Sequence, residues 1–215
     1  MYLQITRPDI TSAVNKLSQF SAAPRKAHHQ ALLKILHYIK GTVGQGLFYS
    51  ASSDLQIRIY VDADYAGCRD TRKSTTGYCI FLGSSLITWK SKKQDVVSKS
   101  SAEAEYRSLS KATDELVWFT NFLKELQVPL SKPTQLYCDN MAAIHIARNP
   151  VFHERTKHIE SDCQSVRERL VAGFFELNHI KSELQIADPF TKPLYPAQFR
   201  YLFGKMGLRN IYDPS

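Results

Sequence analysis

The chain has 215 residues, of which 43% are hydrophobic and 22% charged, a composition typical of a globular protein with one sizeable core. Lys and Arg total 28 against 20 Asp and Glu, so the formal net charge is +8, which favours a polyanionic partner such as nucleic acid. No apolar run approaches the ~18 residues of a membrane-spanning helix, and the four cysteines lack metal-site spacing. We therefore expect a soluble intracellular protein with reduced thiols and no membrane partner.

The first 50 residues are helical in character. Residues 28–40, HHQALLKILHYIK, place their apolar side chains on one broad helical face. Gly41, Gly44 and Gly46 follow, which predicts the end of this helix and a flexible joint.

The stretch LQIRIYVDADYAG, residues 55–67, has the alternating pattern of a β-strand that ends in two carboxylates. The predicted strand reaches Asp62, and Asp64 is expected just beyond it. Open α/β sheets place their chemistry at the carboxyl ends of central strands, so Asp62 is a candidate active-site residue. Taken alone, the pattern is also explained by a strand that ends in an acidic turn.

Two further strands are predicted at residues 76–82 and 86–90, joined by a hairpin at residues 83–85. Three strands with short connections are expected to be antiparallel neighbours. Lys90, Lys92 and Lys93 form a small basic cluster just beyond Trp89.

A long helix is predicted at residues 102–126, with several serines available to cap its start. Glu105 shares the apolar stripe of this helix, whereas Glu103 falls on the opposite side and is expected to face outward. An inward carboxylate is costly unless something compensates its charge, and a metal ion is one such partner. Exposure of Glu105 at the edge of the stripe is the alternative.

The rest of the chain supplies two more acidic residues next to predicted elements. Asp139 follows a short strand at 134–138 and precedes a helix at 141–148. A helix at 158–171 and a strand at 174–180 come next, and Asp188 follows after a short connection. Residues 199–208 form a final amphipathic stretch.

Several stretches, in this order, resemble the ribonuclease H domain of copia-type retrotransposon Pol polyproteins. They are YVDADYAG, STTGYCIFLGSSLITWKSKKQ, SKSSAEAEYRSLS, LYCDNMAAI, RTKHIE and LQIADPFTKPL. The stretches MYLQITRPDI, AVNKLSQFSAAPRKAHHQA and LLKILHYIKGT resemble the carboxyl-terminal end of the reverse transcriptase of the same polyprotein. The resemblance implies an α/β fold: a ribonuclease H-like mixed five-stranded sheet flanked by helices, with an N-terminal helical appendage.

The resemblance also implies the activity and the residues that perform it. Asp62, Glu105, Asp139 and Asp188 match the catalytic carboxylates of the family, which hold two Mg²⁺ ions, or Mn²⁺, and hydrolyse the RNA strand of RNA–DNA hybrids. The implied partners are the hybrid and the rest of the Pol polyprotein, in the cytoplasm within a virus-like particle or in the nucleus. Helix N-termini and short hydroxyls suit phosphates and 2′-hydroxyls, so we expect backbone contacts from a serine and lysine set. That set is Ser98, Ser100, Ser101, Lys90, Lys92 and Lys93.

The expected division is a reverse transcriptase remnant at 1–50, a ribonuclease H-like domain at 51–195 and a helical tail at 196–215. Cellular relatives carry a histidine in the connection before the fourth carboxylate, but residues 181–187 contain none. His179, within the last predicted strand, is the remaining candidate.

Two other functions fit parts of this pattern. The first is a catalytically inactive remnant that acts at most as a nucleic-acid-binding module, because a young relic also retains its carboxylates. The second, an integrase of the same superfamily, is disfavoured, because its acidic order is Asp, Asp, Glu and here Glu105 precedes Asp139.

Overall fold

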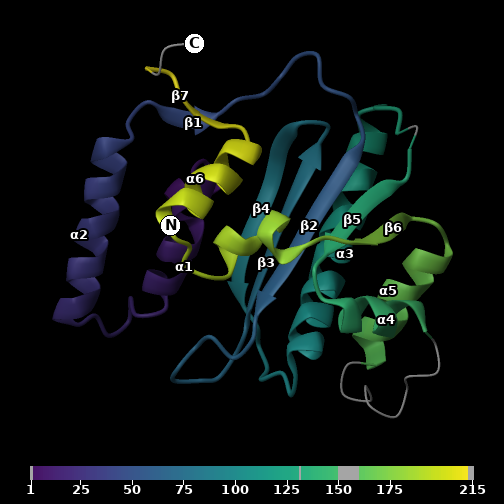
Figure 1. Ribbon diagram of the computed structural model, residues 1–215, viewed down its shortest axis with the longest axis horizontal. Helices are drawn as coiled ribbons and strands as arrows, with labels where there is room; N and C mark the ends of the chain where they lie inside the picture. The colour runs from purple at the N-terminus through teal and green to yellow at the C-terminus, as the bar shows by residue number, and fades with distance from the viewer. Residues whose placement is uncertain (1, 131, 150–159, 213–215) are drawn as a thin grey trace.

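The computed structural model describes residues 2–130, 132–149 and 160–212. Its centre is a five-stranded sheet in the order β4–β3–β2–β5–β6 (Figure 1). The pairs β2–β3 and β3–β4 are antiparallel, whereas β2–β5 and β5–β6 are parallel. This mixed sheet with flanking helices confirms the predicted ribonuclease H-like fold class. Residues 155–159 of the RTKHIE stretch lie outside the described residues.

The bounds of the elements follow the chain in order. The strands are β1 (Gln45–Leu47), β2 (Ile57–Asp64), β3 (Thr75–Leu82), β4 (Ser85–Lys93), β5 (Thr134–Cys138), β6 (Phe175–His179) and β7 (Leu208–Asn210). The α-helices are α1 (Thr11–Ser18), α2 (Lys26–Gly41), α3 (Ser101–Glu125), α4 (Met141–Arg148), α5 (Glu160–Val171) and α6 (Pro196–Lys205). Short 3₁₀ helices are η1 (Tyr2–Ile5), η2 (Pro8–Ile10), η5 (Ser182–Leu184) and η6 (Asp188–Phe190).

Strand β2 lies in the middle of the sheet, and its alternation is the one that the sequence predicts. Ile57, Ile59 and Val61 are buried toward α3. The strand extends further than predicted, because Asp64 still pairs with Thr75 of β3. The expectation that Asp64 lies beyond the strand is therefore wrong.

The hairpin between β3 and β4 has a two-residue turn, Gly83 and Ser84, where three were predicted. Gly83 has a φ of +59°, a left-handed conformation that favours glycine. Strand β4 then pairs with β3 as far as Lys93. The basic cluster consequently lies within β4 and not beyond a strand that ends at residue 90.

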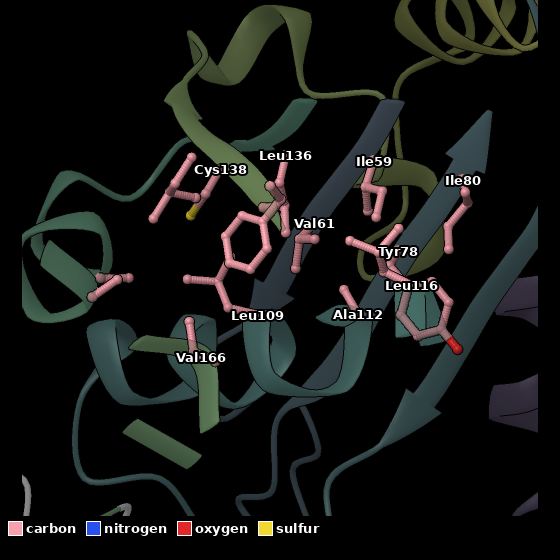
Figure 2. Close-up of a cluster of buried hydrophobic side chains, with 14 of the residues drawn as sticks. Ile59, Val61, Tyr78, Ile80, Leu109, Ala112, Leu116, Leu136, Cys138 and Val166 are labelled. Atoms are coloured by element: carbon pink, nitrogen blue, oxygen red, sulfur yellow. The ribbon is translucent and has the colours of Figure 1, made fainter. Parts of the chain in front are cut away.

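Helix α3 begins where the serine-rich sequence predicts. The Ser100 hydroxyl accepts a hydrogen bond from the Glu103 backbone N–H at 3.1 Å, which caps the helix. Its apolar stripe includes Leu109, Ala112 and Leu116, which pack on the sheet (Figure 2). Burying an aliphatic side chain of this kind stabilises a fold by about 1.5–3 kcal/mol. Within the described ranges, no helix is both long and apolar enough to cross a membrane.

The two faces of the sheet have different covers. Helices α3, α4 and α5 lie on one side, and α1 and α6 lie on the other (Figure 1). The second side has a smaller core, formed by Cys79, Phe81, Leu86, Ala187, Phe190, Phe203, Met206 and Leu208. All four cysteines of the chain are free thiols, as predicted.

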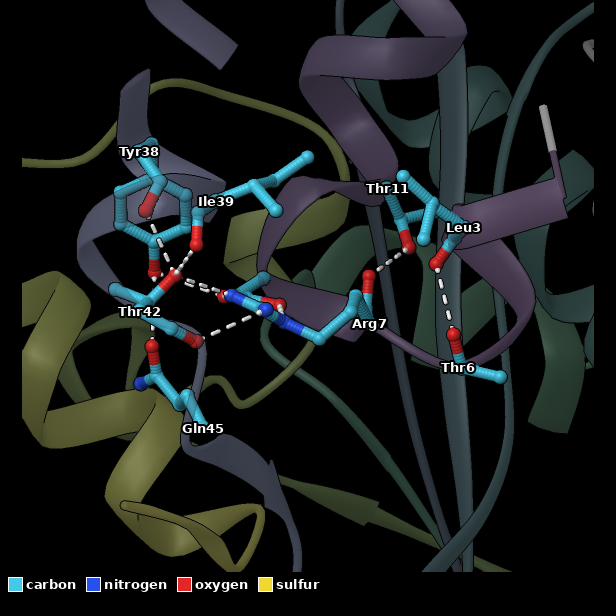
Figure 3. Close-up of polar contacts among 9 residues, drawn as sticks. Leu3, Thr6, Arg7, Thr11, Tyr38, Ile39, Thr42 and Gln45 are labelled. Atoms are coloured by element: carbon cyan, nitrogen blue, oxygen red, sulfur yellow. Dashed lines mark hydrogen bonds and ion pairs between the residues drawn. The ribbon is translucent and has the colours of Figure 1, made fainter. Parts of the chain in front are cut away.

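A polar network fixes the N-terminal helices. Arg7 forms an ion pair with Asp9 at 2.7 Å, and the Tyr38 hydroxyl donates to the same Asp9 oxygen at 2.8 Å (Figure 3). Trp89 of β4 donates its indole N–H to the Gln4 carbonyl at 2.9 Å. This hydrogen bond attaches η1, which precedes Arg7 in the chain, to the sheet. Residues 45–47, expected in a flexible joint, instead form β1 and pair with β7.

Gly77 of β3 permits η6 to lie directly on the sheet. A Cβ added at this position would lie 2.5 Å from Thr191 Cγ2 and 3.0 Å from Phe190 Cβ. The first distance is shorter than real Cβ contacts and the second is tighter than nearly all of them, so η6 lies closer to the sheet than a side chain at residue 77 would allow.

Gly77→Ala should therefore lower the free energy of unfolding by about 1–3 kcal/mol, the usual cost of overpacking. Gly204→Ala is the matched control, because an added Cβ there meets nothing within 4 Å. It should be neutral or stabilising by up to about 1 kcal/mol, since Ala favours helices more than Gly does. Urea unfolding curves measure both variants, and equal midpoints would contradict the close approach of η6.

Candidate active site

The parallel pairing of β2 with β5 brings two of the predicted acids together. Asp62 lies in β2, and Asp139 directly follows β5. Because Val61 is paired with Cys138, the next residues of the two strands, Asp62 and Asp139, are neighbours at the same edge of the sheet. Open α/β sheets place their ligands at this carboxyl edge.

Asp62 is buried, with 3% of its surface exposed. Its Oδ2 accepts a hydrogen bond from the Thr191 hydroxyl, which follows η6. Burial raises the pKa of Asp62, and the Asp139 carboxylate raises it further. The Lys192 charge and the Thr191 hydrogen bond act in the opposite direction and lower this pKa. A desolvated carboxylate of this kind requires a cation or a proton for compensation.

Glu105 lies on the second turn of α3, the helix that packs on one face of the sheet, and it reaches the same edge as Asp62 and Asp139. It is 5% exposed, and its Oε2 has no hydrogen-bond partner within the described part of the chain. Burial raises the pKa of Glu105 to about 9, and the carboxylates of Asp62 and Asp139 contribute. A buried oxygen without a partner costs free energy unless a ligand supplies the missing interaction. The site is therefore built for a group that the chain itself does not provide.

Asp139 is the more open member of the set. The Ser182 hydroxyl donates to its Oδ2 at 2.6 Å. One ligand atom each from Glu105, Cys138 and Asp139 lie within 4.8 Å of one another. The sequence analysis did not anticipate the Cys138 thiol there. Burial raises the pKa of Cys138 well above its ordinary value, so the thiol is neutral beside the carboxylates.

Asp188 opens η6 and is 2% exposed. Burial, together with the Asp62 charge, raises the pKa of Asp188 to about 7, although Lys192 opposes this. The Lys192 ammonium lies 2.8 Å from Asp188 Oδ1. Burial would lower the pKa of Lys192, but the carboxylates of Asp62 and Asp188 raise it overall. The sequence analysis missed this lysine, although its spacing of four residues from Asp188 is one at which side chains often meet.

Asp64 and Glu103, the acidic residues nearest in sequence to Asp62 and Glu105, form hydrogen bonds elsewhere. Asp64, at the end of β2, accepts a hydrogen bond from the Thr75 backbone N–H. Glu103 is 4% exposed, so the prediction that it faces outward is wrong. Its oxygens accept from the Lys99 backbone N–H at 2.8 Å and pair with Arg107 at 3.0 Å. The spacing of Ser100 and Glu103, S-x-x-E, is that of a capping box and is the signal that the sequence analysis overlooked.

The serines that were expected to contact nucleic acid differ in exposure. Ser98 is 3% exposed and donates to Gln94 Oε1 at 3.1 Å, so its hydroxyl is used inside the fold. Ser100 caps α3, and Ser101, the first residue of that helix, is exposed. Ser101 is consequently the serine of the three whose hydroxyl has the freest access to a ligand.

The three lysines of β4 also divide into two kinds. Lys93 is half-buried, and its ammonium contacts Gln19 Oε1 at 3.2 Å and Cys68 Sγ at 2.9 Å. Lys90 and Lys92 are exposed and border a groove of about 500 Å³ between β4 and α3. His179 ends β6 beside Cys138, exposed at the same edge of the sheet as Asp139.

The donor set fits a hard divalent cation. Carboxylate oxygens are the ligands that Mg²⁺ and Mn²⁺ prefer, and Asp62 and Asp139 are close enough to raise the pKa of both Glu105 and Asp188. The unpartnered oxygen of Glu105 gives the same indication independently.

The raised pKa of Glu105 predicts how metal-free stability depends on pH. The folded chain keeps the Glu105 proton up to about pH 9, whereas the unfolded chain loses it near the ordinary value of 4.5. The folded state therefore binds more protons between these values, and stability should fall as pH rises through this window. Glu105→Gln should flatten the decline between pH 6 and 9 in melting curves with EDTA. Glu125→Gln, an exposed acid of the same helix, is the control, and parallel curves for wild type and Glu105→Gln would contradict the burial argument.

A search of solved structures gives ribonuclease H1 of the halophilic archaeon Halobacterium salinarum. It is 14% identical, with a TM-score of 0.45, and the match covers 61% of this chain and 90% of that one. No family model matches the chain.

Curated relatives match nearly the whole sequence. The chain is 43% identical to the retrovirus-related Pol polyprotein from transposon RE1 of Arabidopsis thaliana, over 98% of this chain. It is 38% identical to that from transposon TNT 1-94 of Nicotiana tabacum, over 89% of this chain. In both cases it spans 14% of the relative's length. The chain therefore belongs to the family of retrovirus-related Pol polyproteins of transposons, and it corresponds to one segment of them.

Proposed function

We propose that this chain is a ribonuclease H-type hydrolase, of the copia-type Pol polyproteins, that cleaves the RNA strand of RNA–DNA hybrids. The observation that carries the proposal is the gathering of Asp62, Glu105, Asp139 and Asp188 at one edge of the sheet, with a buried Glu105 oxygen left unpartnered. The similarity to Pol polyproteins over 98% of the chain supports it.

The proposed reaction requires Mg²⁺ or Mn²⁺, and the four carboxylates would hold two such ions. Two bound divalent ions lower the pKa of an attacking water and stabilise the charge that develops on the leaving oxygen. Without such cations, the four acids repel one another.

The chain's own hydroxyls orient two of these carboxylates. Ser182 donates to Oδ2 of Asp139, and Thr191 donates to Oδ2 of Asp62. Each hydrogen bond fixes the rotation of the carboxylate and leaves its other oxygen available to a ligand. Glu105 carries a proton at neutral pH in the metal-free chain, and this proton must leave before both of its oxygens can bind a cation.

The register of the sheet indicates where the hybrid would lie. Asp62 pairs with Gly77, and Gly77 pairs with Ser91, so Ser91 lies two strand spacings, about 10 Å, from Asp62. Lys90 and Lys92 flank Ser91 in the strand but point to the other face of the sheet, where they border the groove beside α3. The groove also has acidic side chains, but Arg107 and Lys111 pair with nearby acids, whereas Lys90 and Lys92 have no ion pair within the described ranges. We assign phosphate contacts to these two lysines.

The rest of the Pol polyprotein is the proposed protein partner. The chain spans only 14% of its relatives, and helix α2 has no buried residue. Leu32, Leu33 and Leu36 of this helix are exposed by 41–49%, which is the kind of apolar surface that a neighbouring segment would cover.

Asp139→Asn tests the site directly. It preserves size and shape, and its amide oxygen can still accept from Ser182, but it removes one charge from the cluster. Cleavage of labelled RNA–DNA hybrid with Mg²⁺ should fall at least about 100-fold, the scale of losing one electrostatic catalytic group. Metal-free thermal stability should stay level or rise, because like-charge repulsion is relieved.

Glu125→Gln, at an exposed position of α3 20 residues after Glu105 and so about 30 Å along the helix, is the control and should leave cleavage unchanged. Near-normal cleavage by Asp139→Asn would show that Asp139 is no ligand. Hybrid binding without cleavage by the wild-type chain at any Mg²⁺ or Mn²⁺ concentration would favour the inactive, nucleic-acid-binding remnant.

Hybrid binding should depend strongly on salt, because phosphate contacts release counterions. The double variant Lys90→Gln/Lys92→Gln should bind hybrid more weakly in EDTA and reduce the slope of log affinity against log salt by about 1–2. Lys40→Gln/Lys124→Gln removes the same charge elsewhere and is the control. An unchanged slope in the first variant would remove Lys90 and Lys92 from the interface.

A further inference from the structure

A lysine lies among the carboxylates of the site, where a divalent cation is expected. Lys192 Nζ is 2.8 Å from Asp188 Oδ1, and the Asp188 side chain is 3% exposed. The Lys192 charge also acts on Asp62 and Glu105, where it favours the ionised carboxylates. This one ammonium therefore interacts with acids from three separate elements.

The position of Lys192 allows it to leave. Its side chain is 43% exposed, although its ammonium reaches the buried Asp188 carboxylate. Lysine has a flexible four-carbon stem and a compact charge, unlike the rigid fork of arginine. The neighbouring Thr191 is held separately, because its hydroxyl contacts both Asp62 Oδ2 and the Asp188 carbonyl. The ammonium can thus swing outward while η6 keeps its place.

We propose that Lys192 is a displaceable internal cation, which holds Asp188 in the metal-free chain and competes with divalent metal for that carboxylate. The proposal rests on the proposed metal-dependent function. A divalent ion has twice the charge of the ammonium, so at comparable distances its Coulomb attraction to the acids is about twice as large, which allows it to compete for them. The lysine then sets the metal concentration at which the site fills, and it limits repulsion among the acids while the site is empty of metal.

Two effects of opposite sign follow for Lys192→Met, which keeps an unbranched stem and removes the charge. Metal-free stability should fall, because the acids lose their compensating cation. Affinity for Mg²⁺ and Mn²⁺ should rise roughly tenfold, since a competitor and a repelling positive charge are both removed. A lysine that only contacts substrate phosphate would instead weaken hybrid binding and leave the metal affinity unchanged.

The test is calorimetric titration of Mg²⁺ and Mn²⁺ into the full chain without nucleic acid, together with melting curves in EDTA. Lys192→Arg retains the charge and pairs with carboxylates through two donors, so its metal affinity should be equal to or lower than that of wild type. Lys124→Met is the matched control. It is an exposed lysine on α3, 19 residues after Glu105 and so about 28 Å along the helix, and it should change neither measurement.

The outcomes separate this proposal from the proposed function. Equal metal affinity in wild type and Lys192→Met would overturn the competition and leave metal-dependent hydrolysis intact. Tighter metal binding by Lys192→Met but not by Lys192→Arg would support it. Absence of metal binding in every variant would overturn both. If Lys192→Met does not fold without metal, a lower affinity of Lys192→Arg than wild type supports the competition, and a higher one refutes it.

Discussion

The rest of the structure depends on one constraint, the parallel pairing of β2 with β5. This pairing sets the ends of the two strands side by side, and each end carries an aspartate. Two further carboxyl groups then approach from opposite layers, Glu105 from α3 and Asp188 from η6. Hydrophobic packing on both faces of the sheet therefore has to outweigh electrostatic repulsion at its edge. The fold tolerates this local cost because the two cores, which begin directly beside the acids at Val61, Cys138 and Ala187, continue along both faces of the sheet and stabilise the layers.

The close seat of η6 makes the arrangement possible. This short element rests on β3 at Gly77 and contributes Asp188 as well as the threonine and lysine that follow it. Its residues supply a fourth acid, a hydroxyl for Asp62 and a cation for the cluster. One 3₁₀ turn and its flank thus carry both an acid of the proposed metal site and the groups that moderate its negative charge. The absence of a side chain at Gly77 of β3 therefore determines whether Asp188, Thr191 and Lys192 can reach the acids at the ends of β2 and β5.

Periodicity predicted the elements well, because burial on one face imposes a repeat that the sequence must display. Strand β2 and helix α3 are of this kind, and so is the inward direction of Glu105. The remaining features depend on contacts between distant segments. Ser182 carries no pattern that marks it, and the four-residue spacing of Lys192 from Asp188 is informative only once η6 has folded back onto the sheet. Glu103 was misjudged because a helical wheel ignores capping, in which an N-terminal carboxylate turns back toward the preceding backbone.

The ladder of β1 and β7 has a consequence for the order in which the chain acquires its structure. Leu47 pairs with Leu208, so the ladder closes a loop of about 160 residues, and closure entropy grows with such a length. During synthesis β1 leaves the ribosome long before β7 exists. Strand β1 therefore stays without this partner until residues 208–210 have been translated. The β1–β7 ladder is thus a late contact that joins two segments distant in the sequence.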